Sequence, residues 1–195
     1  MNAGAEKRAA RQRLLAWRKA MPAALRVAAQ AAIAARLDAW LGGWQQHRAT
    51  PTLAVYWPIR GEPDLREHYL RWRDQGVRLA LPVTPAGPLP LQFARWEADA
   101  RLQRDAFGIP TPVECEFCEP DALLVPCVGF APGGWRLGYG GGFYDRTLAS
   151  RAVVTIGVAF DDCEWPELPC LAHDRPLSMI VTERRVIAGA PLTAD

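Results

Sequence analysis

The sequence lacks a hydrophobic run long enough to cross a bilayer. The uncharged stretch from Ala122 to Trp135 is shorter than the roughly 18 apolar residues of a membrane helix, and prolines and glycines interrupt it. The N-terminal segment also lacks the apolar core of a secretory signal peptide. We therefore predict a cytoplasmic protein with no membrane partner.

Metal-binding and redox motifs are sparse. Cys115 and Cys118 have CxxC spacing, but the chain has no second such pair and only three histidines, at 47, 68 and 173. A closed zinc site is therefore poorly supported. A thioredoxin-like motif should open a helix after a strand, whereas this pair lies between Pro112 and Pro120. Five cysteines, an odd number, favour reduced thiols.

The composition is that of one globular unit. Of the 195 residues, 50% are hydrophobic and 23% are charged, which is enough apolar area to offset chain entropy. We expect a single domain over residues 1–195. The 17 prolines and 16 glycines predict substantial loops, which favours an α/β fold over a helical bundle.

Charge is unevenly distributed along the chain. The net charge is +2, yet residues 1–48 contain nine Lys and Arg against only Glu6 and Asp38. This excess predicts an anionic partner near the N-terminus, either nucleic acid or a small phosphate-bearing ligand, unless it is only a solvated helix face. The remainder of the chain is acidic and has no basic stripe, so we expect no nucleic-acid partner.

Hydrophobic periodicity predicts alternating helices and strands. The expected helices cover 6–20, then 23–41 with Gly42-Gly43 as its stop, a helix capped by Asp64 and ending at Gly76, and 143–150. The expected strands cover 52–57, 77–83, 89–93, 122–128, 152–160 and 179–182. Two of these strands are nearly continuous apolar runs, which indicates a mostly parallel sheet covered on both faces. Ligands bind beyond the carboxyl ends of such strands, so the loop after Val128 is the first candidate for a site.

A glycine-rich segment follows that strand. Residues 133–146 contain six glycines, two arginines and an aspartate. Glycines let backbone N–H groups approach oxyanions, although they can also form only a tight crossover. A Walker A motif is excluded because no Gly-Lys-Ser/Thr follows, and a Rossmann fingerprint is excluded because Phe143 stands in place of its third glycine. A different kind of nucleotide loop stays open.

The run Arg-Leu-Gly-Tyr-Gly-Gly-Gly-Phe-Tyr-Asp-Arg at 136–146 resembles the signature of the 5-formyltetrahydrofolate cyclo-ligases, also called 5,10-methenyltetrahydrofolate synthetases. Supporting matches occur in the same order along almost the whole chain, at Lys7 and Arg11, 56–62, 107–110, 124–126, 157–160, 168–169 and 173–174. The resemblance implies a three-layer α/β/α fold. It also implies ATP- and Mg²⁺-dependent cyclisation of 5-formyltetrahydrofolate to 5,10-methenyltetrahydrofolate, with release of ADP and phosphate.

The resemblance assigns roles to individual residues. Lys7, Arg136 and Asp145 are the implied catalytic residues, and Asp145 and Asp174 the implied magnesium ligands. The implied ATP contacts are Lys7, Arg11, Arg136, Leu137, Gly138, Tyr139, Gly140, Gly141, Gly142, Phe143 and Tyr144. The implied folate contacts are Trp57, Glu62, Tyr139, Gly140, Gly141, Gly142 and Phe143. We expect a monomer that acts on 5-formyltetrahydrofolate with or without a polyglutamate tail.

Structural alternatives apply to several of these residues. Lys7 and Arg11 are four residues apart, so they share a helix face and could form a solvated pair instead. Asp145 could cap a helix, Arg146 could be structural, and Trp57 could be a core residue at a strand end. A non-catalytic folate- or nucleotide-binding protein on the same fold, and an RNA-associated protein, are the rival functions.

Three positions depart from the family's usual pattern. Phe143 replaces a tyrosine, Cys163 replaces a glutamine, and Ser178 replaces an acidic residue. The substitution at Cys163 puts one hydrogen-bonding group near the substrate in doubt. None of the three falls on an implied phosphate or metal residue.

Overall fold

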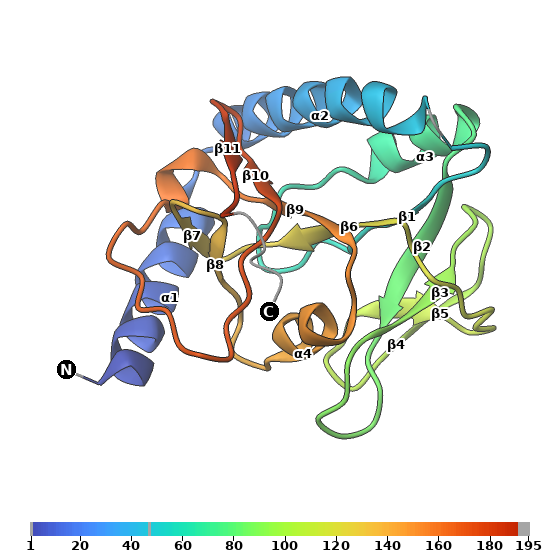
Figure 1. The fold of residues 1–195 in the computed structure, drawn as a ribbon. Helices are drawn as coiled ribbons and strands as arrows, with labels where there is room; N and C mark the ends of the chain where they lie inside the picture. Colours follow the sequence, from blue (N-terminus) through green and yellow to red (C-terminus); the bar gives the residue numbers. More distant parts are fainter. Residues whose placement is uncertain (1, 47, 191–195) are drawn as a thin grey trace.

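A seven-stranded sheet forms the centre of the protein, whose computed structural model describes residues 2–46 and 48–190 (Figure 1). The strand order is β11-β10-β9-β6-β1-β2-β3. The five central strands are parallel, and the two edge strands β3 and β11 are antiparallel to their neighbours, which confirms the mostly parallel sheet. The strand bounds are β1 Thr52–Ala54, β2 Arg78–Val83, β3 Gln92–Arg95, β6 Ala122–Pro126, β9 Val154–Val158, β10 Met179–Val181 and β11 Val186–Ala188.

Helices cover both faces of this sheet, which confirms the three-layer α/β/α prediction. Figure 1 places α2 (Ala23–Gln45) and α3 (Arg66–Asp74) on one face and α4 (Phe143–Ser150) on the other. Alternate residues of β1 serve the two layers: Leu53 packs in the core cluster of α2, while Ala54 belongs to the cluster that contacts α4. The first helix, α1 (Ala3–Ala20), joins the α2 cluster through Ala10 and Leu14. Residues 1, 47 and 191–195 of the expected single domain lie outside the described residues.

The prediction that Gly42-Gly43 ends the second helix is wrong. Helix α2 continues through both glycines to Gln45. Glycine in a helix interior costs only about 1 kcal/mol relative to alanine. Burial of Trp44 and its stacking on Trp40, with ring centroids 5.1 Å apart, favour continuing the helix for that last turn.

Other boundaries also differ from those expected. Strand β1 stops at Ala54, although the backbone N–H of Val55 still donates to the carbonyl of Ala80 in β2 at 2.9 Å. The N-cap of α3 is Leu65, and Asp64 instead accepts hydrogen bonds from the backbone and side chain of Arg66. The elements that the periodicity did not predict are β4 (Leu102–Arg104), β5 (Pro110–Pro112), β7 (Gly129–Ala131), β8 (Trp135–Leu137), β11 and the 3-10 helix η1 (Asp161–Cys163). Each has only three residues, too few for a periodic pattern of hydrophobic residues to be recognised in the sequence.

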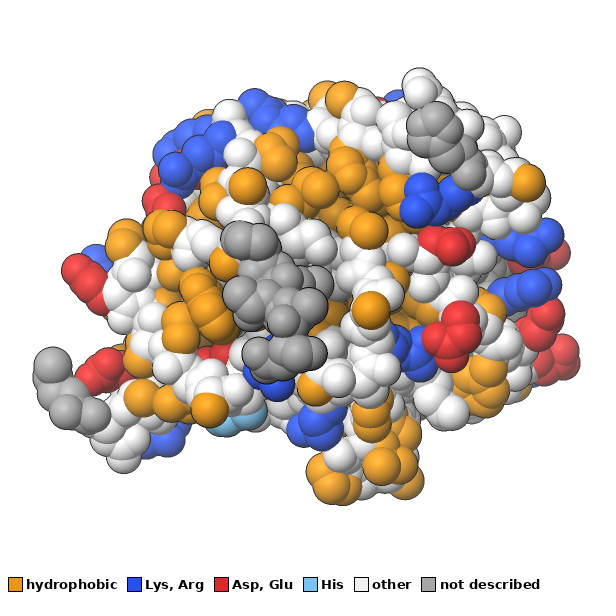
Figure 2. Space-filling model, in the orientation of Figure 1, with side chains coloured by type: hydrophobic (Ala, Val, Ile, Leu, Met, Phe, Trp, Pro, Cys, Tyr) orange, Lys and Arg blue, Asp and Glu red, His pale blue; other side chains and the backbone are white. Residues whose placement is uncertain are grey.

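The surface is mixed in charge. On the face shown in Figure 2, Lys and Arg side chains lie interspersed with Asp and Glu around the margins, and apolar side chains occupy the region below α2. Among the described residues, no helix is both long enough and apolar enough to span a membrane.

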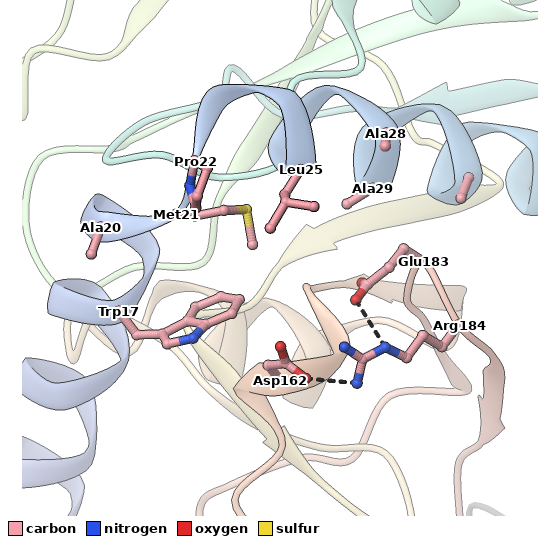
Figure 3. A pocket seen from close by; sticks show the side chains of 11 residues that line it. Trp17, Ala20, Met21, Pro22, Leu25, Ala28, Ala29, Asp162, Glu183 and Arg184 are labelled. Atoms are coloured by element: carbon pink, nitrogen blue, oxygen red, sulfur yellow. Dashed lines mark ion pairs between the residues drawn. The ribbon is translucent and has the colours of Figure 1, made fainter.

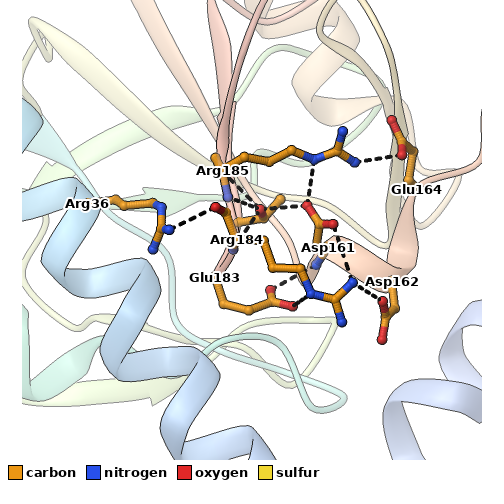
Figure 4. A network of polar contacts seen from close by, with 8 residues as sticks. Arg36, Asp161, Asp162, Glu164, Glu183, Arg184 and Arg185 are labelled. Carbon is orange, nitrogen blue, oxygen red and sulfur yellow. Dashed lines mark hydrogen bonds and ion pairs between the residues drawn. The ribbon is translucent and has the colours of Figure 1, made fainter.

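A polar network ties the β10–β11 turn to η1 and α2 (Figure 4). Asp161 accepts hydrogen bonds from Thr182 Oγ1 at 2.8 Å and Arg185 Nε at 2.9 Å, and Arg36 donates to the carbonyl of Arg184 at 2.8 Å. Burial favours a higher pKa for Asp161, but the hydrogen bonds from Arg185 and Thr182 outweigh it, so the pKa is lowered. The ionised carboxylate therefore stabilises the fold.

We expect Asp161→Ala to lower the free energy of unfolding by about 2 kcal/mol at pH 7, because two donors lose a charged acceptor. A lowered folded-state pKa means that this contribution is present above the ordinary carboxyl pKa of about 4 and is lost as the pH falls through the folded value. Urea denaturation at pH 7 and at low pH measures both effects. Asp162→Ala is the matched control, since Asp162 is half exposed and pairs with Arg184, and should cost less than about 1 kcal/mol. Equal losses for both variants would contradict the network's role.

Candidate active site

A cavity of about 530 Å³ opens at the carboxyl ends of the central parallel strands. Its floor includes Trp57, just beyond β1, Pro82 near the end of β2, and Pro126 at the end of β6. This is where a parallel sheet is expected to bind a ligand. Its walls contain every site residue singled out from the sequence: Lys7, Arg11, Trp57, Glu62, Arg136, Leu137, Gly138, Tyr139, Gly140, Gly141, Gly142, Phe143, Tyr144, Asp145 and Asp174.

A second cavity, of about 470 Å³, lies at the junction of α1 and α2 (Figure 3). Its lining is largely apolar, with Trp17, Met21 and Leu25 on one side and the Arg184 ion pairs on the other. None of the residues predicted to act on a ligand lines it. The chemistry of the molecule is therefore concentrated in the first cavity.

Basic side chains meet at one end of the first cavity. Lys7 and Arg11 share a face of α1: Lys7 Nζ lies 2.5 Å from Asp174 Oδ2, and Arg11 Nε donates to the carbonyl of Gly138 at 2.6 Å. Arg136 donates to Asp145 Oδ1 at 2.7 Å. The solvated-pair alternative is wrong for Lys7, which is buried with only 7% of its surface exposed.

The glycine-rich segment is a strand followed by a tight turn, and not a loop throughout. Arg136 and Leu137 belong to β8, which pairs with β7. Beyond them Gly140 (φ 95°) and Gly142 (φ 70°) adopt left-handed conformations that disfavour other residues, and Gly142 is the N-cap of α4. No side chain among residues 2–46 and 48–190 caps this helix, so its first N–H groups are available to an anion at the edge of the cavity.

The capping alternative for Asp145 is also wrong. Asp145 lies within the first turn of α4, three residues after the N-cap Gly142, and its carboxylate pairs with Arg136. Asp174 is held similarly, by Lys7 and by the backbone N–H of Leu171 at 2.7 Å. Burial favours a higher pKa for Asp174, but these hydrogen bonds outweigh it and the pKa is lowered. Asp174 is therefore ionised, and both carboxyl groups line the cavity, each beside a basic side chain.

Glu62 lines the same cavity and is almost fully buried. Its Oε2 accepts from the backbone N–H of Ile59 at 2.9 Å, and its Oε1 accepts from the hydroxyl of Tyr139 at 2.8 Å. Burial raises the pKa of Glu62 to about 7, although the two hydrogen bonds and the nearby Arg18 and Arg60 oppose the shift. A carboxyl group that titrates near neutrality is typical of functional sites.

Aromatic rings line the cavity beside Glu62. Trp57 is half buried and packs edge-to-face on Trp96, while Phe143 packs edge-to-face on the exposed Phe107. Trp57 is thus more than a core residue at the end of a strand, because it also lines the cavity. The ring at Phe143 is retained in the cavity wall although the family's usual hydroxyl is missing.

The other two departures lie outside the cavity lining. Cys163 is fully buried in η1, and burial raises its pKa to about 11, so it presents no group to a ligand. Ser178 exchanges hydrogen bonds with Thr155 across β10 and β9, including a backbone N–H donated to Thr155 Oγ1 at 2.9 Å. Neither Cys163 nor Ser178 lines the cavity.

Sequence reasoning missed Arg18, which lies behind the cavity wall and donates to the hydroxyl of Tyr139 at 3.3 Å. It also missed the contribution of Arg60 and Thr84 to the lining. For Arg18 the only available signal was its place four residues after Leu14, on the buried side of α1.

The sheet topology and this cavity define an α/β protein whose site combines basic side chains, a glycine-rich turn and a buried carboxyl group. A model of the 5-formyltetrahydrofolate cyclo-ligase family matches residues 3–183, so the chain belongs to that family. It is accordingly an enzyme, a ligase of folate metabolism.

Individual relatives agree with this assignment. The chain is 33% identical over 190 residues to the 5-formyltetrahydrofolate cyclo-ligase of Mycolicibacterium smegmatis, covering 92% of this chain and 94% of that one. It is 34% identical over 145 residues to the Escherichia coli K12 cyclo-ligase, covering 69% and 79%. The NMR structure of Aquifex aeolicus 5,10-methenyltetrahydrofolate synthetase superimposes with a TM-score of 0.75 at 29% identity, covering 93% of this chain and 92% of that one.

Proposed function

We propose that this protein converts 5-formyltetrahydrofolate into 5,10-methenyltetrahydrofolate using ATP and Mg²⁺, with release of ADP and phosphate. One observation carries the proposal: a single cavity is lined by basic side chains beside a glycine-rich turn, and also by a buried carboxyl group and aromatic rings. The first set suits a polyphosphate and the second suits a pterin, so both substrates can bind in one cavity.

The residues of the cationic end fit a triphosphate. Arg136 is buried, and its Nε has no hydrogen-bond partner among the described residues, which leaves a donor for a phosphate oxygen. Lys7 and Arg11 add two positive charges from one face of α1. Phosphoryl transfer depends mainly on such positioning and charge neutralisation.

The residues also fit a magnesium ion that arrives with ATP. Mg²⁺ is usually held by one or two carboxylates together with substrate phosphates. Asp145 and Asp174 line the same cavity, and each lies beside a basic side chain. When bound, the ion would neutralise phosphate charge, and the protein's part would be to supply these two oxygen donors.

At the other end, Glu62 and Trp57 fit the pterin ring. An ionised carboxylate accepts hydrogen bonds from the donor-rich edge of a pterin, and a tryptophan ring offers an apolar surface for stacking. Glu62 stays well oriented because Ile59 and Tyr139 each hold one of its oxygens. In this arrangement the protein binds and aligns the two substrates and excludes water from them. No side chain has to act as a nucleophile.

The test is an absorbance assay for the methenyl product with purified protein, 5-formyltetrahydrofolate and Mg-ATP. We expect product only when both ATP and the divalent cation are present, with one ADP released per product. Product at full rate with a non-hydrolysable ATP analogue would overturn the proposal. Binding of folate and ATP without turnover would instead indicate a non-catalytic binding protein.

We expect Asp145→Asn to raise the Mg²⁺ concentration for half-maximal activity roughly tenfold, because the variant keeps the shape of the side chain but loses the charge that a hard cation prefers. Asp162→Asn, outside the cavity, is the matched control. Mg²⁺ titrations of activity at constant ATP measure the effect, and circular dichroism checks folding. Superimposable titration curves for the Asp145 variant and the wild type would exclude a metal role for Asp145.

A further inference from the structure

Arg18 is a fully buried cation that no step of the proposed reaction uses. Its guanidinium donates to the carbonyls of Cys127 at 2.6 Å and Val128 at 3.3 Å, and to the hydroxyl of Tyr139 at 3.3 Å. Its Nε has no partner among the described residues. Burying a charge is costly unless nearby groups compensate for it, so a fully buried arginine needs a reason beyond packing.

The hydroxyl of Tyr139 links this cation to the carboxylate in the cavity. A phenol has one proton, and here it is donated to Glu62 Oε1 at 2.8 Å while the oxygen accepts from Arg18. The second oxygen of Glu62 accepts from the backbone N–H of Ile59. The hydrogen bonds thus run in one direction, from Arg18 through Tyr139 to Glu62, and every donor points toward an ionised carboxylate.

We propose that Arg18 is a positioning residue for the folate end of the site: acting through Tyr139, it favours the ionised form of Glu62 and fixes the carboxyl group in the cavity wall. The proposal rests on the folate role given to Glu62 above. Arg18 itself contributes nothing to the cavity lining. It acts on the substrate only through the tyrosine and the carboxylate.

The charges around Glu62 show why this cation is needed. The titratable groups that face Glu62 come from several elements: Arg18 of α1, Arg60 of its own loop, Tyr69 of α3, Tyr139 of the glycine-rich segment, Tyr144 of α4, and Tyr56 and Cys127 beyond two central strands. Burial raises the pKa of the tyrosines and of Cys127, so these groups stay neutral at physiological pH. Only Arg18 and Arg60 are cations, and Arg60 is exposed to screening by solvent.

The backbone around Arg18 holds the same loop in place. Arg26, at the start of α2, donates to the carbonyl of Arg18 at 2.5 Å and to the carbonyl of Gly61 at 2.7 Å. Arg60 (φ 47°) and Gly61 (φ 74°) both adopt left-handed conformations immediately before Glu62. A turn of this kind is sparsely populated unless its surroundings over-determine it. The junction of α1 and α2 therefore fixes both the loop that carries Glu62 and the charge that faces it.

The test measures the ionisation of Glu62 directly. The wild type, Arg18→Met, Arg18→Lys and Arg60→Met are labelled with ¹³C at the glutamate side chain, and the Glu62 carboxyl signal, assigned with Glu62→Gln, is titrated by NMR without ligands. Methionine fills the space but removes the charge, so Arg18→Met should shift the midpoint of Glu62 upward by about one pH unit or more. Arg18→Lys keeps the charge, and Arg60→Met removes an exposed one, so each should shift the midpoint by less than about half a unit.

The pH profile of kcat/KM for 5-formyltetrahydrofolate should shift in the same way as the Glu62 midpoint. The fall in kcat/KM at acid pH should move to higher pH in Arg18→Met and stay nearly unchanged in Arg18→Lys. A purely structural role would lower activity in both variants without moving this fall. If Arg18→Met fails to fold, Tyr139→Phe breaks the same chain of hydrogen bonds and should also raise the Glu62 midpoint. An unshifted midpoint in the folded variants would overturn the proposal.

The two proposals can fail separately. The NMR titration needs no substrate, so it reads out the Arg18 effect even if the wild type proves unable to form the methenyl product. Conversely, an active wild type whose Glu62 midpoint is insensitive to Arg18→Met would refute only the positioning role.

Discussion

Replacing Arg136 with methionine is expected to lower kcat/KM for ATP by roughly 100- to 1000-fold. The reason is that a buried guanidinium with an unpartnered Nε is the best-placed donor for developing phosphate charge, and loss of one such preorganised donor has effects of this size. Steady-state kinetics at saturating folate measure the loss. Arg136→Lys should retain part of the activity, because it keeps the charge but loses the planar fork.

Two controls separate this role from the ion pair that Arg136 makes with Asp145. Arg95→Met removes a half-exposed arginine that pairs with Glu116 outside the cavity, and should change kcat/KM by less than about twofold. The double variant Arg136→Met/Asp145→Asn should regain thermal stability relative to Arg136→Met, since it removes the uncompensated carboxylate. Recovery of activity in the double variant would show that Arg136 serves only to pair with Asp145.

Replacing Glu62 with glutamine is expected to lower kcat/KM for 5-formyltetrahydrofolate roughly 100-fold while the KM for ATP stays within about twofold. Loss of charge-assisted hydrogen bonds to the pterin accounts for a factor of this size. Isothermal titration of each ligand separates the two effects. Glu67→Gln, on the exposed side of α3, is the matched control. Equal losses for folate and ATP would return Glu62 to a general structural role.

The pH dependence provides an independent check on Glu62. Since the pKa of Glu62 is raised to about 7, the ionised form that accepts from the pterin gains population as the pH rises through that value. Wild-type kcat/KM for folate should therefore fall about tenfold for each pH unit below 6, and Glu62→Gln should abolish this limb. If kcat/KM for folate still falls at acid pH in Glu62→Gln, a group other than Glu62 causes the fall.

The same raised pKa has a consequence for stability. The unfolded chain ionises Glu62 near its ordinary pKa, whereas the folded protein does so only near 7, so this residue weakens the fold progressively as the pH rises between those two values. In Glu62→Gln the neutral amide has no ionisation cost. This gain offsets the loss of one of the two hydrogen-bond-accepting oxygens of the carboxylate. The variant's loss of activity should therefore occur without a large fall in melting temperature.

Sequence patterns predicted the features that repeat or that carry a motif. The period of α1, the start and end of α4, and the apolar runs of β6 and β9 are local properties of the chain, and each appears in the structure within a few residues of its expected bounds. The candidate site residues came from the glycine-rich segment and from the resemblance it supports. Their gathering into one cavity follows from the rule that parallel strands point their carboxyl ends to one edge.

The features that escaped prediction depend on contacts between distant parts of the chain. The extension of α2 past Gly42-Gly43 depends on packing of Trp40 and Trp44, which overrides the local preference for a stop. The β7–β8 hairpin has strands of three residues, too short for alternation to be read. Only its place four residues after Leu14 separated Arg18 in sequence from the solvated arginines of the same helix, and the folded structure shows what surrounds it.

The contact between Lys7 and Asp174 joins residues 167 positions apart, and this has a consequence for how the protein is made. During synthesis the first helix leaves the ribosome long before the segment that contains Asp174. Until that segment emerges, Lys7 cannot form its ion pair. The proposed ATP-binding end of the cavity can form only after nearly the whole chain has left the ribosome. Activity, and protection of the first helix from proteases by ATP, would therefore report on completion of the entire polypeptide, and a chain truncated before residue 174 would fail both measurements.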